Sequence, residues 1–196
     1  TVIGVVCAAL CGYGLSRYQF KGKAFLLSFL LVTQMFPAVM KIIPYYKILV
    51  SVHLNNTQIG LMVVYASFSI PFCTWMMYGY FKSISTGLDE AARVDGSSAF
   101  NTFLKIILPI ALPGLVATII YAFLQNWNEY MFASVLMSAD EKKTITYAIS
   151  TMADAYKIQW NYLMCAAMIS SVPTLTVFVV MQKYLIAGMT AGAVKE

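Results

Sequence analysis

The chain has 196 residues, enough for one ordinary domain, but 60% of them are hydrophobic and only 11% are charged. Globular proteins carry about 25% charged residues, and the mean hydropathy here is +0.74, so the composition excludes a soluble fold with a water-facing surface. The formal net charge of +5 comes from basic residues scattered singly between apolar stretches, which fits the loops of a membrane protein and excludes a nucleic-acid-binding stripe.

Apolar stretches of near-membrane length follow one another along the chain. A helix needs about 20 residues to cross the hydrocarbon core. Five stretches predict such spans, at residues 1–15, 24–40, 59–81, 106–128 and 158–182. Because a proline removes a backbone donor, Pro37 and Pro44 predict kinks in and just after the second stretch, while Pro71 interrupts the third and Pro173 lies within the fifth. The expected fold class is an all-α membrane protein with a single domain over residues 1–196. Since Thr1 lies within a hydrophobic run, we expect a sixth span upstream.

The polar connections between the predicted spans differ in positive charge. Lys and Arg number eight in 17–23, in 82–105 and in the C-terminal region from 183, against five in the remaining connections. By the positive-inside rule, the insert at 82–105 and the C-terminus therefore face the cytoplasm. The segment at 138–157 is then the largest external connection.

The sequence lacks the residue patterns of covalent chemistry. It has one histidine, His53, no glycine-rich phosphate loop, and no pair of carboxylates placed for a cleft. The four cysteines form no CxxC pair and lie in apolar stretches, so we expect buried structural thiols at Cys7, Cys11, Cys73 and Cys165. We therefore expect no enzyme activity, metal or cofactor in this chain, and any ATP that drives it would be used by a partner.

The insert at 82–105 is the longest segment that is neither continuously apolar nor an obvious loop. Thr86 can cap a helix, and Asp89 three residues on completes a capping-box pattern. Gly96 can adopt the left-handed conformation that ends such a helix, and the serines that follow it can cap the next. Apolar residues then recur at helical spacing, at Phe100, Phe103, Leu104 and Ile107. The insert thus predicts a helix, a bend and a second helix that contact a partner; the alternative is an amphipathic loop on the membrane surface.

The same insert carries a spaced signature. Glu90-Ala91-Ala92 is followed after three residues by Gly96, and after nine more by Ile106-x-Leu108-Pro109. This spacing resembles the signature of the permease subunits of binding-protein-dependent ABC importers. Further stretches resemble the carbohydrate-uptake branch of that family, the maltose-type permease that pairs with a larger one, at 14–23, 34–39, 126–130 and 185–196. The resemblance covers nearly the whole chain.

The resemblance implies a type I ABC importer transmembrane domain in a bacterial or archaeal cell membrane, with the insert at 82–109 acting as a coupling helix. It implies as partners a second permease subunit, two cytoplasmic ATPase subunits that hold ATP and Mg, and an extracellular solute-binding protein. Carried over residue by residue, it implies ATPase docking at Glu90, Ala91, Ala92, Asp95, Gly96, Leu104 and Pro109. It also implies a contact of the C-terminal tail with the ATPase dimer, at Thr190, Gly192 and Lys195.

Polar residues late in the fourth predicted span, and one in the second, are candidates for the solute pathway. Polar groups at membrane depth are unfavourable unless they face a cavity or a partner. An aromatic ring can stack on a sugar and amides can bond its hydroxyls, so we expect the pathway at Gln34, Gln125, Asn126, Trp127, Asn128 and Glu129. The alternative is that Trp127, Glu129 and Tyr130 mark the outer interface of the membrane, where aromatic residues collect.

The expected function is to form half of the translocation pathway for a sugar or oligosaccharide in an ATP-driven importer. Within transport, the alternative is a permease for another small solute, such as a polyamine or phosphate. A stand-alone ion-coupled carrier would need coupling charges at the membrane midplane, where Glu129 is the only acid we expect. A membrane-embedded enzyme would need the catalytic cluster that the sequence lacks.

Overall fold

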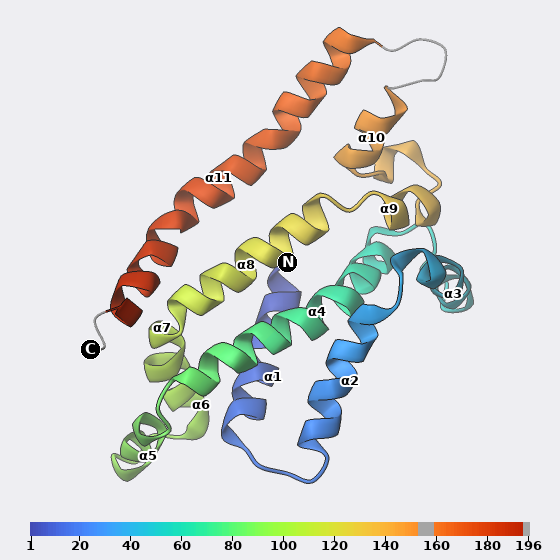
Figure 1. The fold of residues 1–196 in the computed structure, drawn as a ribbon. Helices are drawn as coiled ribbons and strands as arrows, with labels where there is room; N and C mark the ends of the chain where they lie inside the picture. Colours follow the sequence, from blue (N-terminus) through green and yellow to red (C-terminus); the bar gives the residue numbers. More distant parts are fainter. Residues whose placement is uncertain (153–158, 194–196) are drawn as a thin grey trace.

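The computed structural model describes residues 1–152 and 159–193, and their side chains except at 140 and 185–193. Within these ranges the chain is helical and has no β-strand, which confirms the all-α fold class (Figure 1). The longer helices are α1 (Val2–Arg17), α2 (Lys23–Met35), α3 (Ala38–Ser51), α4 (Gln58–Ser83), α8 (Leu112–Trp127) and α11 (Trp160–Ala193). The shorter elements are α5 (Gly87–Val94), α6 (Ala99–Thr102), the π-helix η1 (Phe103–Ile107), α7 (Leu108–Ile110), α9 (Met131–Leu136), the 3-10 helix η2 (Asp140–Lys142) and α10 (Ile145–Thr151).

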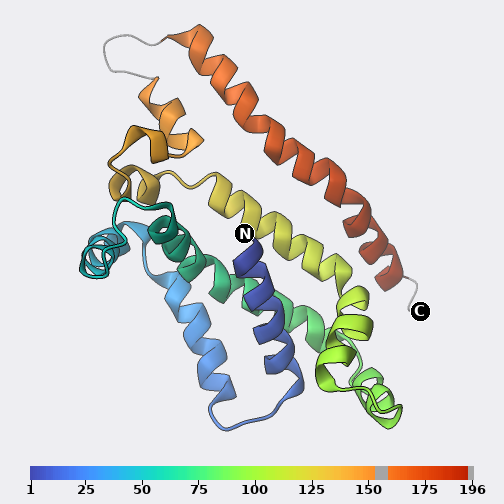
Figure 2. The same ribbon diagram turned by 180° about the vertical axis from the view of Figure 1, so that it is seen from behind.

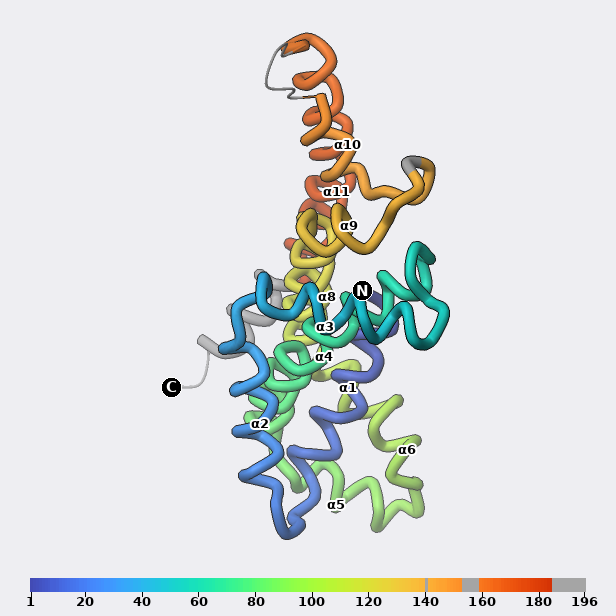
Figure 3. Tube along the Cα trace, turned by 90° about the vertical axis from the view of Figure 1, so that its right-hand side faces the viewer, coloured from blue at the N-terminus to red at the C-terminus, as the bar shows by residue number. Residues whose placement is uncertain are grey.

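Helix α4 lies at the centre of this arrangement. It packs against α1, α2 and α8, while α11 packs against α8 (Figures 1 and 2). One end of the bundle carries α5, α6 and the turn between α1 and α2, and the opposite end carries α3, α9 and α10 (Figures 1 and 3). The connections at 17–23 and 82–105, which hold six of the eight Lys and Arg counted above, therefore lie at the same end of the molecule. Which end faces the cytoplasm stays a prediction.

Membrane-spanning length is reached in two ways within the described chain. Two continuous helices are long and apolar enough to cross a membrane, α4 and the part of α11 at Trp160–Tyr184. Two more spans arise if each bent pair counts as one, α2 with α3 at 100° and Ala99–Ile110 with α8 at 81°. Helix α1 is apolar but has 16 residues. The helices overlap all of the predicted stretches, and the number of spans stays a prediction.

The kink predicted at Pro37 is a complete break between two helices. Phe36 has an extended backbone, with φ −71° and ψ 124°, because the proline ring that follows disfavours the helical conformation there. Helix α2 ends at Met35, and residues 24–40 do not form one straight span. In contrast, Pro44 lies inside α3, and Pro71 and Pro173 lie inside the continuous helices α4 and α11.

The last helix is longer than the sequence predicted. We expected the final span to end near 182 and a short tail to follow, but α11 runs to Ala193. Alanine, leucine and methionine in this stretch favour a helix, and isolated glycines do not stop it. Thr190 and Gly192 are described as helix backbone only, and Lys195 lies outside the described residues, so the contact of the tail with the ATPase stays a prediction.

Two hydrophobic cores hold the helices together. The larger one lies among α1, α4, α8 and η1, and contains the fully buried Met77, Phe81 and Ile107. Helices α1 and α4 approach closely because Gly12 has no side chain; a Cβ there would lie 2.8 Å from Met77 Cβ. The second core joins α3, α4 and α9 at the opposite end. Helix α2 has no buried residue, so it presents apolar surface for lipid or partner subunits.

The cysteines are not all buried, contrary to expectation. Cys73 is buried in the larger core and Cys7 is half-buried, whereas Cys11 and Cys165 are exposed. The prediction was wrong for the last two because an apolar helix of a membrane protein also directs apolar residues outward, toward lipid or neighbouring subunits. All four thiols are free.

Candidate functional site

The insert forms the helix, bend and second helix that its local signals predict. Gly96 has a positive φ of 79° and follows α5 directly. The Gly96 N–H donates to Arg93 O at 3.0 Å and the Ser97 N–H donates to Ala92 O at 2.9 Å, which is the Schellman arrangement at a helix end. Ser98 Oγ then accepts a hydrogen bond from the Asn101 N–H at 3.3 Å and caps α6. We call residues 86–105 the elbow.

The predicted capping box at the start of the elbow is absent. The Thr86 side chain makes no capping hydrogen bond, and its backbone is helical, with φ −67° and ψ −21°. Instead, Ser85 Oγ accepts from the Gly87 N–H at 3.2 Å. Asp89 does not reach back to Thr86, because its carboxylate is buried against α1. A tertiary contact has therefore replaced the local one.

The surface of the elbow presents most of the residues for which docking was predicted. Those that are exposed are Glu90, Ala91, Asp95, Gly96, Leu104 and Pro109. Ala92 is 4% exposed and faces the interior of this chain, where its small side chain lets α5 lie close to the core. Val94, which the sequence did not single out, is 87% exposed and adds an apolar contact point on α5. Docking itself stays a prediction for these residues.

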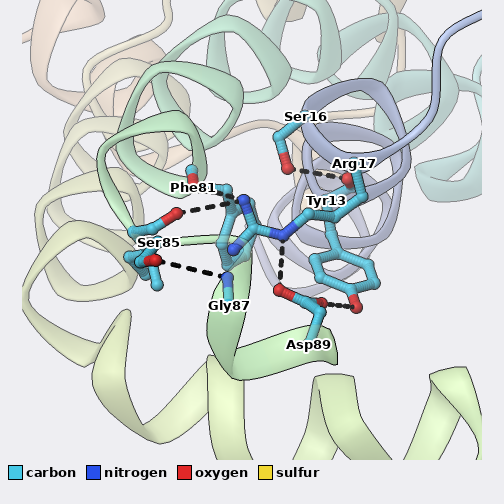
Figure 4. Close-up of polar contacts among 8 residues, drawn as sticks. Tyr13, Ser16, Arg17, Phe81, Ser85, Gly87 and Asp89 are labelled. Carbon is cyan, nitrogen blue, oxygen red and sulfur yellow. Dashed lines mark hydrogen bonds and ion pairs between the residues drawn. The ribbon is translucent and has the colours of Figure 1, made fainter. Parts of the chain in front are cut away.

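A buried polar cluster fixes the elbow to the ends of two long helices (Figure 4). Tyr13 Oη donates to Asp89 Oδ1 at 2.5 Å, and Arg17 Nε lies 2.8 Å from Asp89 Oδ2. Arg17 Nη1 also donates to Phe81 O at 3.0 Å and Ile84 O at 3.2 Å, where α4 ends. We call Tyr13, Arg17 and Asp89 the anchor cluster. Local sequence patterns do not reveal it, because its members are far apart in the chain and locally indicate only a loop charge and a helix cap.

A polar cavity of about 410 Å³ lies where α8 ends, away from the elbow. Three of the residues predicted for the solute pathway line it, namely Gln125, Asn128 and Glu129. The other lining residues are Tyr121, Leu124, Tyr130 and Met131. The two amides and the two tyrosines provide donors, acceptors and aromatic faces around one space. This volume lies within the range of about 300 to 1,000 Å³ that is typical of small-molecule sites.

Both carboxylate oxygens of Glu129 accept hydrogen bonds from groups of this chain. Its Oε1 accepts from the Phe132 N–H at 2.8 Å, and its Oε2 accepts from the Ala133 N–H at 3.1 Å. Tyr65 Oη, on α4, donates to the same Oε2 at 2.6 Å. The carboxylate therefore satisfies the free N–H groups at the start of α9 and ties that helix to α4. An acid just before an apolar helix was the sequence signal for this role.

The remaining pathway residues lie apart from this cavity. Trp127 Nε1 donates to Ser170 O at 3.1 Å, so the indole joins α8 to α11. Asn126 Oδ1 accepts from Ser69 Oγ at 3.2 Å and borders a second cavity of about 260 Å³. Gln34 lies on α2, where its Nε2 donates to Thr33 Oγ1 at 3.3 Å. The structure thus brings together three of the six predicted residues, and none of them has a tested role.

Apolar helices of spanning length, an exposed helical elbow at one end and a polar cavity toward the other define a helical membrane-transport protein. Residues 1–191 match the family described as the binding-protein-dependent transport system inner membrane component, and the chain belongs to that family. The resemblance drawn from the Glu90 signature is thereby confirmed, and the chain is an ABC transporter permease.

Relatives named as permeases match the chain throughout. The probable ABC transporter permease protein YurM of Bacillus subtilis is 38% identical over 194 residues, which are 99% of this chain and 65% of that protein. The trehalose/maltose transport system permease protein MalG of Thermococcus litoralis is 32% identical over 196 residues, 100% of this chain and 70% of its own length. The trehalose transport system permease protein SugB of Mycobacterium tuberculosis is 31% identical over 197 residues, which are 100% of this chain and 72% of that protein. The chain therefore spans about two thirds to three quarters of these relatives.

A solved structure shares the fold. It is the crystal structure of a bacterial ABC transporter involved in the import of the acidic polysaccharide alginate. The match has a TM-score of 0.75 and 27% identity, and it covers 93% of this chain and 70% of the other. The expected type I importer fold of the transmembrane domain is confirmed by this match together with the family.

Proposed function

We propose that this chain is one of two permease subunits in an ATP-driven importer of a sugar or oligosaccharide. The observation that carries the proposal is the elbow: buried polar contacts hold it to α1 and α4, it exposes Glu90, Ala91 and Gly96 of the signature, and it projects from one end of the bundle (Figure 1). Relatives named for trehalose and maltose transport support the solute class. The partners are a second permease, two ATPase subunits that hold ATP and Mg, and an extracellular solute-binding protein.

The exposed face of α5 is the docking surface in this proposal. Ala91 has almost no side chain, so an ATPase backbone can come close to the helix. Glu90 beside it can pair with a basic group on the ATPase, and such a pair strengthens once the interface excludes water. ATP binding moves the two ATPase subunits together, and the elbow carries that movement to the bundle. The paired permeases then open the pathway alternately to the two sides of the membrane.

The cavity at the end of α8 is the section of the solute pathway that this chain supplies. Gln125 and Asn128 are exposed within it, so their amides can bond sugar hydroxyls. Tyr121 and Tyr130 also line it, and their rings are paired with Phe72 at 4.4 Å and with Tyr147 at 6.1 Å. Trp127 is not part of this section, because its N–H bonds Ser170 and its ring stacks on Phe123 at 5.5 Å.

The lining of this cavity favours a neutral solute over the alternatives. The described residues that line it include no Lys or Arg, so they lack the counter-charge that phosphate would need. Its one acid, Glu129, has both oxygens engaged within the chain, so it is poorly placed to bind a polyamine or to couple transport to an ion. An uncharged polyhydroxylated solute fits the remaining groups.

Solute uptake by the purified complex, reconstituted into proteoliposomes, tests the proposal. The solute is the sugar that the co-expressed binding protein retains on purification. We expect uptake that requires ATP inside the vesicles. Asn128→Leu should raise the solute concentration for half-maximal uptake about tenfold, equivalent to the loss of one hydrogen bond.

The matched control is Trp127→Phe. It keeps the aromatic ring and removes the N–H that bonds Ser170, so it should lower the melting temperature of the complex and leave the half-maximal concentration unchanged. Uptake that follows an ion gradient without ATP would contradict the proposed function. A larger concentration shift for Trp127→Phe than for Asn128→Leu would contradict the position of the pathway.

A further inference from the structure

The anchor cluster joins four parts of the chain at one buried point. Arg17 is the last residue of α1, Phe81 and Ile84 lie at the end of α4, and Asp89 lies in the first turn of α5 (Figure 4). The Tyr13 ring also packs against Phe103 of η1, with centroids 4.8 Å apart. The elbow therefore meets α1 and α4 through directed polar contacts and not through apolar packing alone.

We propose that the anchor cluster positions the elbow against α1 and α4, so that these helices move with it when an ATPase partner moves α5. This inference rests on the proposed function and names residues within it that neither the family match nor the relatives assign. The three residues are positioning residues, because they lie away from the exposed docking face and from the cavity.

Helix α4 gives the displacement a route to the solute cavity. Its end at Phe81 is held by Arg17, and its Tyr65, roughly 24 Å away at about 1.5 Å per residue, bonds Glu129 at the cavity. Helix α4 is continuous between these two contacts, with Pro71 inside it, so a shift of one end can reach the other end along a single helix. The two contacts thus connect the elbow with the solute pathway through a single element.

The burial and hydrogen bonding of the Arg17–Asp89 pair indicate that it adds little to the free energy of unfolding. The side chains of Arg17 and Asp89 are 5% and 7% exposed, so both charges have lost most of their water. Arg17 Nη2 has no hydrogen-bond partner among the described residues. A buried ion pair with incomplete hydrogen bonding often contributes no more stability than apolar side chains of similar size. What the pair provides is fixed geometry between α1, α4 and α5.

This property permits a variant that separates position from stability. In Arg17→Met with Asp89→Leu, both charges are replaced by apolar groups, so no uncompensated charge is left in the core. The Tyr13 hydroxyl and the Phe81 and Ile84 carbonyls each lose a partner, so the complex should still assemble but with a lower melting temperature. A second, milder variant is Tyr13→Phe, which removes the hydrogen bond to Asp89 and keeps the ring packing. The control is Met77→Ala, which leaves a cavity in the α1–α4 contact and removes none of the polar contacts of the anchor cluster.

The experiment measures solute molecules transported per ATP hydrolysed by assembled complexes in proteoliposomes, beside the melting temperature of each complex. We expect this ratio to fall about tenfold in the double variant, a typical size for coupling between sites, and to fall less in Tyr13→Phe. Met77→Ala should lower the melting temperature and keep the wild-type ratio.

A wild-type ratio in the double variant and in Tyr13→Phe overturns the inference, as does an equal fall of the ratio in Met77→Ala. If neither cluster variant assembles well and the complex that is recovered has the wild-type ratio, the cluster is structural and the inference is again overturned. A wild-type complex that transports nothing on ATP hydrolysis contradicts the proposed function instead, so the two failures are distinguishable.

Discussion

Glu129 stands between α8 and α9, and its carboxylate accepts hydrogen bonds from two backbone N–H groups and from Tyr65. An amide at this position keeps one acceptor oxygen but turns an NH₂ group toward donors. We expect Glu129→Gln to lower the stability of the complex by about 1 to 2 kcal/mol, as the loss of a helix cap does. Thermal unfolding of the purified complex measures this change.

The control for Glu129→Gln is Glu141→Gln, which changes an exposed carboxylate at the same end of the molecule and should leave the melting temperature unchanged. If Glu129→Gln abolishes uptake at unchanged stability, the carboxylate contacts the solute and its role as a cap is secondary.

Gly96 illustrates how a single backbone conformation shapes the elbow. A Cβ added at 96 would meet no atom within 4 Å, so space does not exclude alanine there; the positive φ of 79° does. Gly96→Ala should cost about 1 to 2 kcal/mol, the penalty of the left-handed conformation for a residue with a Cβ. We expect a lower melting temperature and less ATP-driven uptake.

Gly79→Ala is the matched control for the conformational penalty. A Cβ at 79 also meets no atom within 4 Å, but Gly79 lies inside α4, where alanine is the better helix former. The melting temperature of the Gly79→Ala complex should be equal to that of the wild type or higher. A similar loss in both variants would show that the backbone conformation of Gly96 is not what matters.

At the level of helices, local signals predicted local structure well. Gly96 and Ser98 gave the end of α5 and the start of α6, because both act through backbone groups within a few residues. Thr86 failed as a cap because Asp89 has stronger partners, Tyr13 and Arg17, which no local pattern reveals.

The prolines also show that local sequence patterns do not reveal the effect of the surrounding fold. Every proline within a helix removes one hydrogen bond, so the sequence predicted kinks at Pro37 and Pro44 alike. Pro37 separates two helices, whereas Pro44 is accommodated inside α3, as Pro71 and Pro173 are inside α4 and α11. Which outcome occurs depends on the packing around each proline, and that depends on the whole fold. The sequence could not show, for the same reason, that the six predicted pathway residues lie in four different surroundings.

Close helix packing supplies a prediction at this scale. A Cβ at Gly12 would lie 2.8 Å from Met77 Cβ and 2.9 Å from the backbone nitrogen of Tyr78, so a larger side chain must push α1 away from α4. We expect Gly12→Val to destabilise the complex by about 1 to 3 kcal/mol, the usual penalty of overpacking. Gly14→Val, two residues along the same helix, meets nothing within 4 Å and is the control. Equal melting temperatures for the two variants would contradict the close approach of α1 and α4.

The whole molecule separates its two candidate sites along one axis. The elbow lies at the end that carries the turn between α1 and α2, and the polar cavity lies toward α9 at the other (Figures 1 and 3). In the proposed function, the ATPase moves the elbow and the solute passes through the polar cavity, with α4 and α8 between the two sites. Under the same proposal, the ATP is held by a partner that docks at the elbow.

The measurement that tests this account most directly is ATP-driven uptake by the reconstituted complex after a change at the exposed face of α5. The variant is Glu90→Lys with Ala91→Leu, which reverses the charge and adds bulk where an ATPase would lie. Both side chains are exposed, so the chain itself should fold and insert normally. We expect the ATPase subunits to be lost on purification or uptake to fall at least about tenfold, while Asn101→Lys, at an exposed position on α6, keeps both. Unchanged uptake and an intact complex in the α5 variant would contradict the account.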